Sequence, residues 1–228
     1  FDVIDSDIVL TSPLEVEILD KFINAKNVDS ISAKMSCVPC KDLNYVYTIY
    51  SRMGGGGAVV RGEGKFESDT IVVNNIKTSG VLDGLVNLTV QLTDTTSALI
   101  STKTAQYLKD VVYPKSYYAR SNIQDQGWSN IDNMVVQIEV ESEDVGGTYN
   151  LNISNYDNNR PSSLLGSSDN FSQVSLTGLI NESKFDLIKK SINFDKLSSL
   201  QDGYIVLNLV VTDSVGNIGD PTLSYYMK

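Results

Sequence analysis

Hydrophobic and polar residues alternate with a period of two along much of the chain. In the segment 85–92 one side consists of Val86, Leu88, Val90 and Leu92, and the other of Leu85, Asn87, Thr89 and Gln91. In the segment 204–211 one side consists of Ile205, Leu207, Leu209 and Val211, and the other of Tyr204, Val206, Asn208 and Val210. This second side is more apolar than its counterpart in 85–92, so we expect it to be partly covered. Successive side chains of a β-strand point to opposite faces, so the pattern predicts strands with one buried face.

Similar runs recur at short intervals and are separated by Gly, Asn, Asp and Ser. We expect further strands at 14–19, 45–50, 70–76, 104–113, 134–142, 149–156, 172–180 and 222–227. About seven short strands per hundred residues is typical of a β-sandwich. Helical spacing is poor, and the segment 97–108 is interpreted as a turn and a strand because it aligns with a proline-containing segment near the end of the chain.

An internal repeat divides the chain into two copies. Asp83-Gly84 aligns with Asp202-Gly203, Thr93-Asp94 with Thr212-Asp213 and Tyr107 with Tyr226, all 119 residues apart. Upstream the separation is nearer 104, so the second copy has extra residues, which we expect in a loop at 158–172. We therefore predict two domains, 1–114 and 115–228, with a linker around 114–126.

The end of the second copy resembles the last two strands of bacterial and archaeal immunoglobulin-like surface domains, the tandem modules of adhesins, biofilm proteins and S-layer proteins. The residues that carry this resemblance are Asp202, Gly203, Tyr204, Asp213, Gly216 and Asn217, and the first copy keeps Asp83, Gly84 and Asp94. The resemblance implies an all-β chain of two tandem immunoglobulin-like antiparallel β-sandwich domains. We assign these residues structural roles: Asp-Gly and Gly-Asn turns, and a tyrosine corner at Tyr204.

Charge and composition exclude several functions. The chain has 18 basic and 28 acidic residues, a net charge of −10 and no histidine. Nucleic-acid binding and anionic membrane surfaces are disfavoured, because both need basic patches. No apolar run approaches the roughly 18 residues that span a bilayer. The commonest general base is missing and no acidic pair stands out for glycoside hydrolysis, so we predict that the chain is not an enzyme and requires no cofactor.

Cys37 and Cys40 form a CxxC motif. Such a motif serves as a redox pair, as half of a zinc site or as a local disulfide. A redox pair is expected in a βαβ unit, and a zinc site needs two further ligands that neither Cys nor His supplies here. We favour a disulfide, with free or partner-linked thiols as the alternative. The nearby run Gly54–Gly57 is interpreted as a hairpin tip, since its flanks are strands and no phosphate-loop lysine follows.

Calcium is the one metal that the composition suggests. Asp213, Asn217 and Asp220 carry the oxygen ligands that calcium prefers, and so do Asp2, Asp5 and Asp7. The resemblance implies calcium near domain junctions, but turn formation explains the same aspartates.

Aromatic residues are concentrated around the predicted domain boundary. They are Tyr107, Tyr113, Tyr117, Tyr118 and Trp128. Tyr117, Tyr118 and Trp128 are candidates for binding glycans or a partner protein, whereas packing between the domains is the structural alternative. Sequons for glycosylation occur at Asn87, Asn152, Asn170 and Asn181, and we expect the side chains of Asn87 and Asn152 to point outward.

These observations predict a structural protein of the cell surface or the extracellular space. It would serve in a surface layer, filament or adhesin stalk, through domain packing and edge-strand contacts with neighbouring copies or other surface proteins. The alternatives are a lectin-like adhesin module, accessory domains of a secreted hydrolase and a virion decoration protein. Because the chain begins at Phe1, we expect either a removed signal peptide or a piece of a longer protein.

Overall fold

The computed structural model describes residues 8–52, 57–121, 135–155, 173–187 and 204–227. The chain divides into two compact units, Phe1–Val112 and Tyr113–Lys228. Each unit has a hydrophobic core of its own. Among the described residues, no helix is long and apolar enough to cross a membrane.

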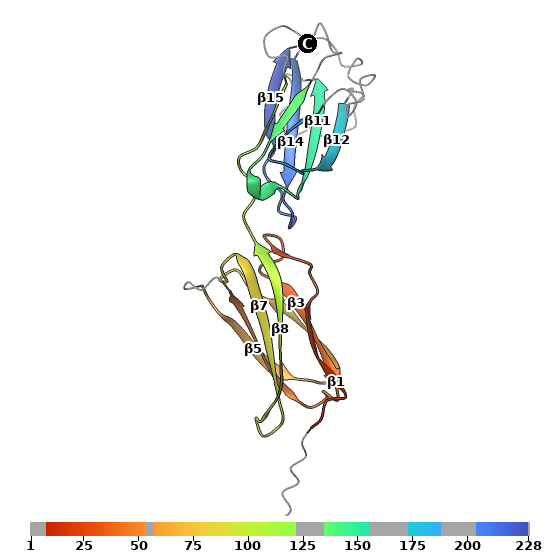
Figure 1. Ribbon diagram of the computed structural model, residues 1–228, viewed down its shortest axis with the longest axis vertical. Helices are drawn as coiled ribbons and strands as arrows, with labels where there is room; N and C mark the ends of the chain where they lie inside the picture. Colours follow the sequence, from red (N-terminus) through yellow and green to blue (C-terminus); the bar gives the residue numbers. More distant parts are fainter. Residues whose placement is uncertain (1–7, 53–56, 122–134, 156–172, 188–203, 228) are drawn as a thin grey trace, which may run out of the picture. The chain divides into compact units, whose positions relative to one another are not determined.

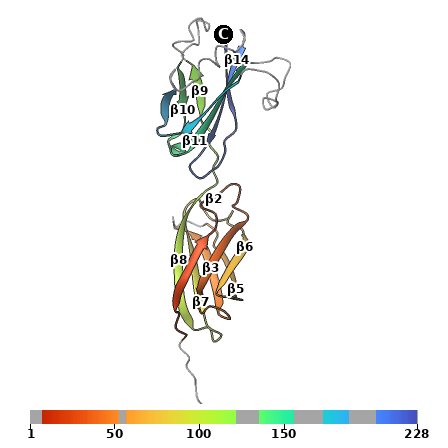
Figure 2. The same ribbon diagram turned by 90° about the vertical axis from the view of Figure 1, so that its right-hand side faces the viewer.

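Unit 1 is a sandwich of two sheets (Figure 2). One sheet has the order β1 (Ser12–Ile18), β3 (Ile31–Val38), β6 (Thr70–Ile76). The other has the order β2 (Ile23–Asn24), β8 (Leu99–Asp110), β7 (Gly84–Thr93), β4 (Asn44–Ser51), β5 (Val60–Lys65). The strands pair antiparallel except β2, which pairs parallel with β8.

Unit 2 has a similar arrangement, but among its described strands there is no counterpart of β2. Its first sheet has the order β13 (Lys184–Leu187), β10 (Val136–Glu139), β9 (Tyr118–Ser121). Its second sheet has the order β12 (Gln173–Leu179), β11 (Thr148–Asn155), β14 (Tyr204–Thr212), β15 (Thr222–Met227) (Figure 1). The predicted fold class is confirmed: the chain is all-β and consists of two immunoglobulin-like antiparallel sandwiches.

The repeat extends to the pairing register of the strands. Asn44 pairs with Thr93 in unit 1, and Thr148 pairs with Thr212 in unit 2. Asn44 and Thr148 are 104 residues apart, whereas Thr93 and Thr212 are 119 apart. The two offsets found in the sequence therefore describe the same strand pair in both units, and the extra residues of unit 2 lie between β11 and β14.

The alternating pattern identifies the buried faces correctly. In β7 the side chains of Val86, Leu88, Val90 and Leu92 are buried, and in β14 those of Ile205, Leu207, Leu209 and Val211. Val206, on the opposite face of β14, is also buried, at 1% exposed. The apolar character of that face therefore correctly predicted that part of it is shielded from solvent.

Two expectations about the elements were wrong. The proposed linker contains β9, which pairs with β10 and belongs to unit 2. The strand β3 was not predicted, because its buried residues include the weakly apolar Ala33 and Cys37. The segment 97–108 lies mostly in β8, as interpreted, and β4 and β5 flank the glycine run antiparallel. Gly54, Gly55 and Gly56 lie outside the described residues.

Candidate functional site

Both carboxylate oxygens of Asp213 accept hydrogen bonds within the turn between β14 and β15. Its Oδ1 accepts hydrogen bonds from the amides of Val215 and Asn217, both at 2.9 Å, and its Oδ2 accepts one from the side-chain amide of Asn217 at 2.8 Å. In the part of the chain that the structure describes, no three acidic or cysteine side chains are grouped to hold a metal. Calcium at Asp213, Asn217 and Asp220 stays a prediction, and Asp2, Asp5 and Asp7 lie outside the described residues.

Unit 1 forms the equivalent turn around Asp94. Its Oδ1 accepts hydrogen bonds from the Thr96 hydroxyl at 2.7 Å and from the amides of Thr96 and Ala98 at 2.8 and 2.9 Å. The hydroxyl of Thr96 and these amides lower the pKa of Asp94. Thr96 and Ala98 correspond to Val215 and Asn217 at the offset of 119, so both aspartates are turn residues.

Asp144 is a buried acid next to the turn of unit 2. It ends the 3₁₀ helix Ser142–Asp144, its side chain is 3% exposed and its Oδ2 accepts no hydrogen bond. Burial, and then the neighbouring charges of Glu141, Glu143 and Asp213, raise its pKa to about 6. No local pattern indicates this burial, because Asp144 lies in an acidic run that is typical of a solvent-exposed turn.

The predicted ligand-binding tyrosines have structural partners. Tyr117 is only 4% exposed, its hydroxyl donates to the carbonyl of Asp220, and its ring lies against Gly219, where an added Cβ would be 2.7 Å from the ring carbon Cε1. Burial raises the pKa of Tyr117. A ring enclosed in this way presents no face to a ligand, so Tyr117 is not retained as a ligand-binding residue.

Tyr118 lies on the outer face of the β9–β10–β13 sheet. Its hydroxyl donates to Oε2 of Glu139, which also pairs with Lys184 at 3.4 Å, and the guanidinium of Arg120 lies 4.2 Å from the ring centroid. The hydrogen bond to Glu139 raises the pKa of Tyr118. Ligand binding at Tyr118 stays a prediction, and Trp128 lies outside the described residues.

Two other tyrosines connect the sheets within their own units. The hydroxyl of Tyr107 on β8 accepts the amide of Ile18 on β1 at 2.7 Å. The hydroxyl of Tyr226 on β15 accepts the amide of Ser121 on β9 at 3.0 Å. The sequence alignment had paired Tyr107 with Tyr226, but their shared role is visible only in the fold. Tyr113 is 48% exposed, and the side chain of Tyr204 lies outside the description.

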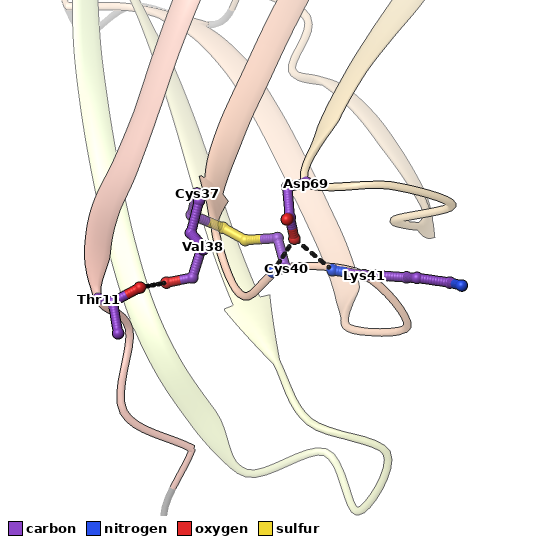
Figure 3. The surroundings of a disulfide bond; sticks show 6 residues. All are labelled: Thr11, Cys37, Val38, Cys40, Lys41 and Asp69. Atoms are coloured by element: carbon purple, nitrogen blue, oxygen red, sulfur yellow. Dashed lines mark hydrogen bonds between the residues drawn. A yellow bond between two sulfur atoms is a disulfide. The ribbon is translucent and has the colours of Figure 1, made fainter.

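Cys37 and Cys40 form a disulfide at the end of β3 (Figure 3). Their Cα atoms are 5.3 Å apart and both side chains are buried. Oδ1 of Asp69 accepts the amides of Cys40 at 2.7 Å and Lys41 at 3.2 Å, and these bonds lower the pKa of Asp69. Buried sulfurs do not meet the access that thiol exchange requires, so the bridge is structural.

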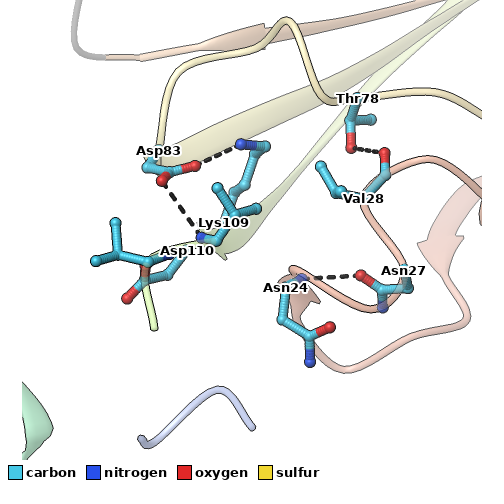
Figure 4. A network of polar contacts seen from close by, with 9 residues as sticks. Asn24, Asn27, Val28, Thr78, Asp83, Lys109 and Asp110 are labelled. Carbon is cyan, nitrogen blue, oxygen red and sulfur yellow. Dashed lines mark hydrogen bonds and ion pairs between the residues drawn. The ribbon is translucent and has the colours of Figure 1, made fainter. Parts of the chain in front are cut away.

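An ion pair between a buried lysine and a half-buried aspartate supports the end of β8 (Figure 4). Lys109 is 2% exposed and pairs with Oδ1 of Asp83, whose Oδ2 accepts the amide of Val111 at 3.3 Å. Close by, the hydroxyl of Thr78 donates to the carbonyl of Val28 at 2.9 Å. The Asp-Gly motif of the first copy therefore provides a counter-charge as well as the turn residue Gly84, whose φ is 109°.

The predicted glycosylation sites differ in accessibility. Asn87 lies on the outward face of β7, as expected, but it is only 9% exposed and accepts a hydrogen bond from the side-chain amide of Gln106 at 3.1 Å. Asn152 is half-buried and accepts a hydrogen bond from Ser175 at 2.6 Å. Asn181 is exposed, and Asn170 lies outside the described residues.

No protein-family model and no curated protein matches the chain. Among solved structures, it is similar to the tetra-tandem repeat in the extending region of a large adhesion protein, with 13% identity and a TM-score of 0.37 over 95% of this chain and 49% of that one. It is also similar to the chicken CNTN1 FN1–FN3 domains, with 8% identity and a TM-score of 0.42 over 93% of this chain and 63% of that one. The fibronectin(III)-like modules of Clostridium thermocellum CbhA give 10% identity and a TM-score of 0.41, with 93% of each chain covered. The chain thus spans about half of the length of the adhesion-protein structure and under two thirds of the length of the CNTN1 structure. Likenesses at this identity concern the fold and carry no statement about binding or activity.

Proposed function

We propose that the chain is a non-enzymatic structural segment of an extracellular or cell-surface protein of the bacterial and archaeal immunoglobulin-like type. It serves in a surface layer, filament or adhesin stalk. The observation that supports this is the repeated structural use of the same polar residues. Asp94 and Asp213 accept hydrogen bonds from backbone amides in equivalent turns, and Tyr107 and Tyr226 hydrogen-bond the two sheets of their own units to each other. Residues that would attract a catalytic or binding interpretation are thus used to hold each sandwich together.

The disulfide supports the extracellular part of the proposal. Disulfides persist in oxidising compartments and are rare where glutathione keeps thiols reduced. Cys37 and Cys40 are joined in a buried bridge. A lectin-like module is less well supported, because Tyr117 is enclosed in the core of unit 2.

Antibody labelling of source cells tests this function. We expect antibodies against the purified chain to label intact, unpermeabilised cells. In protein taken from their surface, we expect Cys37 and Cys40 to react with an alkylating reagent only after reduction. Labelling that needs permeabilisation, together with freely reactive cysteines, would overturn the proposal. An antibody against a known cytosolic protein serves as the control for cell integrity.

A further inference from the structure

The strand β12 lies at the edge of its sheet in unit 2. It pairs with β11 through seven residues, from Gln173 to Leu179, and among the described strands none pairs with its other side (Figure 1). An edge strand presents unpaired backbone amides and carbonyls that another extended strand can bind.

The side chains of β12 do nothing to block such pairing. The strand contains no charged residue and no proline. Gln173, Ser175, Thr177 and Leu179 are exposed, Leu179 to 65%, while Val174 and Leu176 pack against the core. Natural sheets usually protect their edges with charges or proline.

The corresponding edge of unit 1 is protected in this way. Its strand β5 exposes Arg61, Glu63 and Lys65 in alternation. Charged side chains on an edge strand discourage its pairing with another strand. The two units thus share a topology but differ in whether this edge is open.

The absence of charge on β12 is the feature that suits this strand to a second copy. At a net charge of −10 two copies repel each other, and this repulsion is weakest where the facing surfaces carry no charge. The neighbouring outward residues of β11, Thr148, Asn150 and Asn152, are also uncharged. Antiparallel pairing about a two-fold axis through Leu176 places Ser175 of each copy opposite Thr177 of the other. It also keeps the core-facing residues of both copies on one side.

We propose that β12 is the strand through which two copies of the chain associate, pairing antiparallel with its counterpart and joining two four-stranded sheets into one. This inference rests on the proposed function. It specifies which strand makes the edge contacts, β12, and which partner it binds, a second copy of the chain. Seven residues make a small interface, so the association is weak and requires high concentration.

Light scattering of the full chain at rising concentration tests the inference. We expect the mass to rise from 25.0 kDa towards twice that value. The variants Ser175→Lys/Thr177→Lys and Ser175→Glu/Thr177→Glu place like charges opposite each other, so each alone is expected to stay monomeric. An equimolar mixture of the two is expected to associate more strongly than the parent, because lysine then faces glutamate in the stated register.

Two controls separate the edge from the fold. Ser175→Ala removes the 2.6 Å hydrogen bond to Asn152 without adding charge, and Glu63→Lys changes the charge of the other edge. Both are expected to associate like the parent. Association of the Lys/Lys variant, or a mixture that stays monomeric, overturns the inference. A parent chain that is monomeric at every concentration also overturns it, and leaves surface labelling of intact cells as the separate test of the function.

Discussion

The β7–β8 turn of unit 1 and the β14–β15 turn of unit 2 have the same backbone hydrogen bonds but different residues. The amide of Asp94 donates to Ala98 and that of Asp213 to Asn217, both at 3.0 Å. The residue before each acceptor has a positive φ, 71° at Ser97 and 92° at Gly216. The two turns therefore share the aspartate and the left-handed backbone position, whereas their other residues differ.

The buried polar groups of the two units differ much more. Unit 1 buries the ammonium of Lys109, which pairs with the half-buried Asp83, and a disulfide, whereas unit 2 buries the carboxyl of Asp144 without a charge partner. One topology thus accommodates a paired charge in one copy and an unpaired acid in the other. Each difference predicts a distinct response to mutation.

The largest effect is expected at the ion pair of unit 1. Asp83→Ala leaves the ammonium of Lys109 buried without its partner, and we expect a loss of about 3 kcal/mol in the free energy of unfolding. Calorimetry of the full chain measures this as a lower melting temperature of one transition. Asp83→Ala/Lys109→Met removes both charges and is expected to recover most of the loss. A double variant as unstable as the single one would show that the charge is not the cause.

The next effect concerns the acid of unit 2. Folding raises the pKa of Asp144 from 3.8 to about 6, so the folded form binds this proton more tightly than the unfolded form. The contribution to stability is fully present below pH 3.8 and is lost as the pH rises through about 6. We expect Asp144→Asn to exceed the parent in stability by about 2 kcal/mol at pH 8 and to match it at pH 4.

Calorimetry between pH 4 and pH 8 measures this difference. Glu182→Gln serves as the control, because Glu182 is exposed and is not among the charges that raise the pKa of Asp144. If the Asn variant followed the pH dependence of the parent, Asp144 would not be the titrating group.

A smaller effect is expected at the two tyrosines. Tyr226→Phe removes the hydrogen bond from the buried amide of Ser121, and Tyr107→Phe removes the hydrogen bond from the partly buried amide of Ile18. We expect losses of about 2 and about 1 kcal/mol in the respective units, because losing a hydrogen bond costs more where water has less access. Native-state hydrogen exchange at Ser121 and Ile18 assigns each loss to its unit. Equal protection in variant and parent would contradict a stabilising role.

How far the sequence predicts this molecule depends on the range of the interactions. Alternation along β7 and β14 predicts their buried faces, and the aspartate turns follow from local spacing. The acceptor role of Tyr107 depends on a contact with Ile18, 89 residues away, which no local pattern contains. The burial of Asn87 arises in the same way from Gln106 on the neighbouring strand. Long-range packing therefore decides the features that local sequence patterns do not predict.

The smallest effect is expected at the one position of each turn whose backbone is left-handed, which is a serine in unit 1 and a glycine in unit 2. Ser97 and Gly216 both have positive φ, which glycine adopts without strain and other residues adopt at a cost of about 1 kcal/mol. We expect Ser97→Gly to stabilise unit 1 by up to about 1 kcal/mol and Gly216→Ser to destabilise unit 2 by a similar amount. Melting temperatures from calorimetry check both. Shifts of opposite sign are required if the turns are equivalent, and a stabilised Gly216→Ser variant would show that they are not.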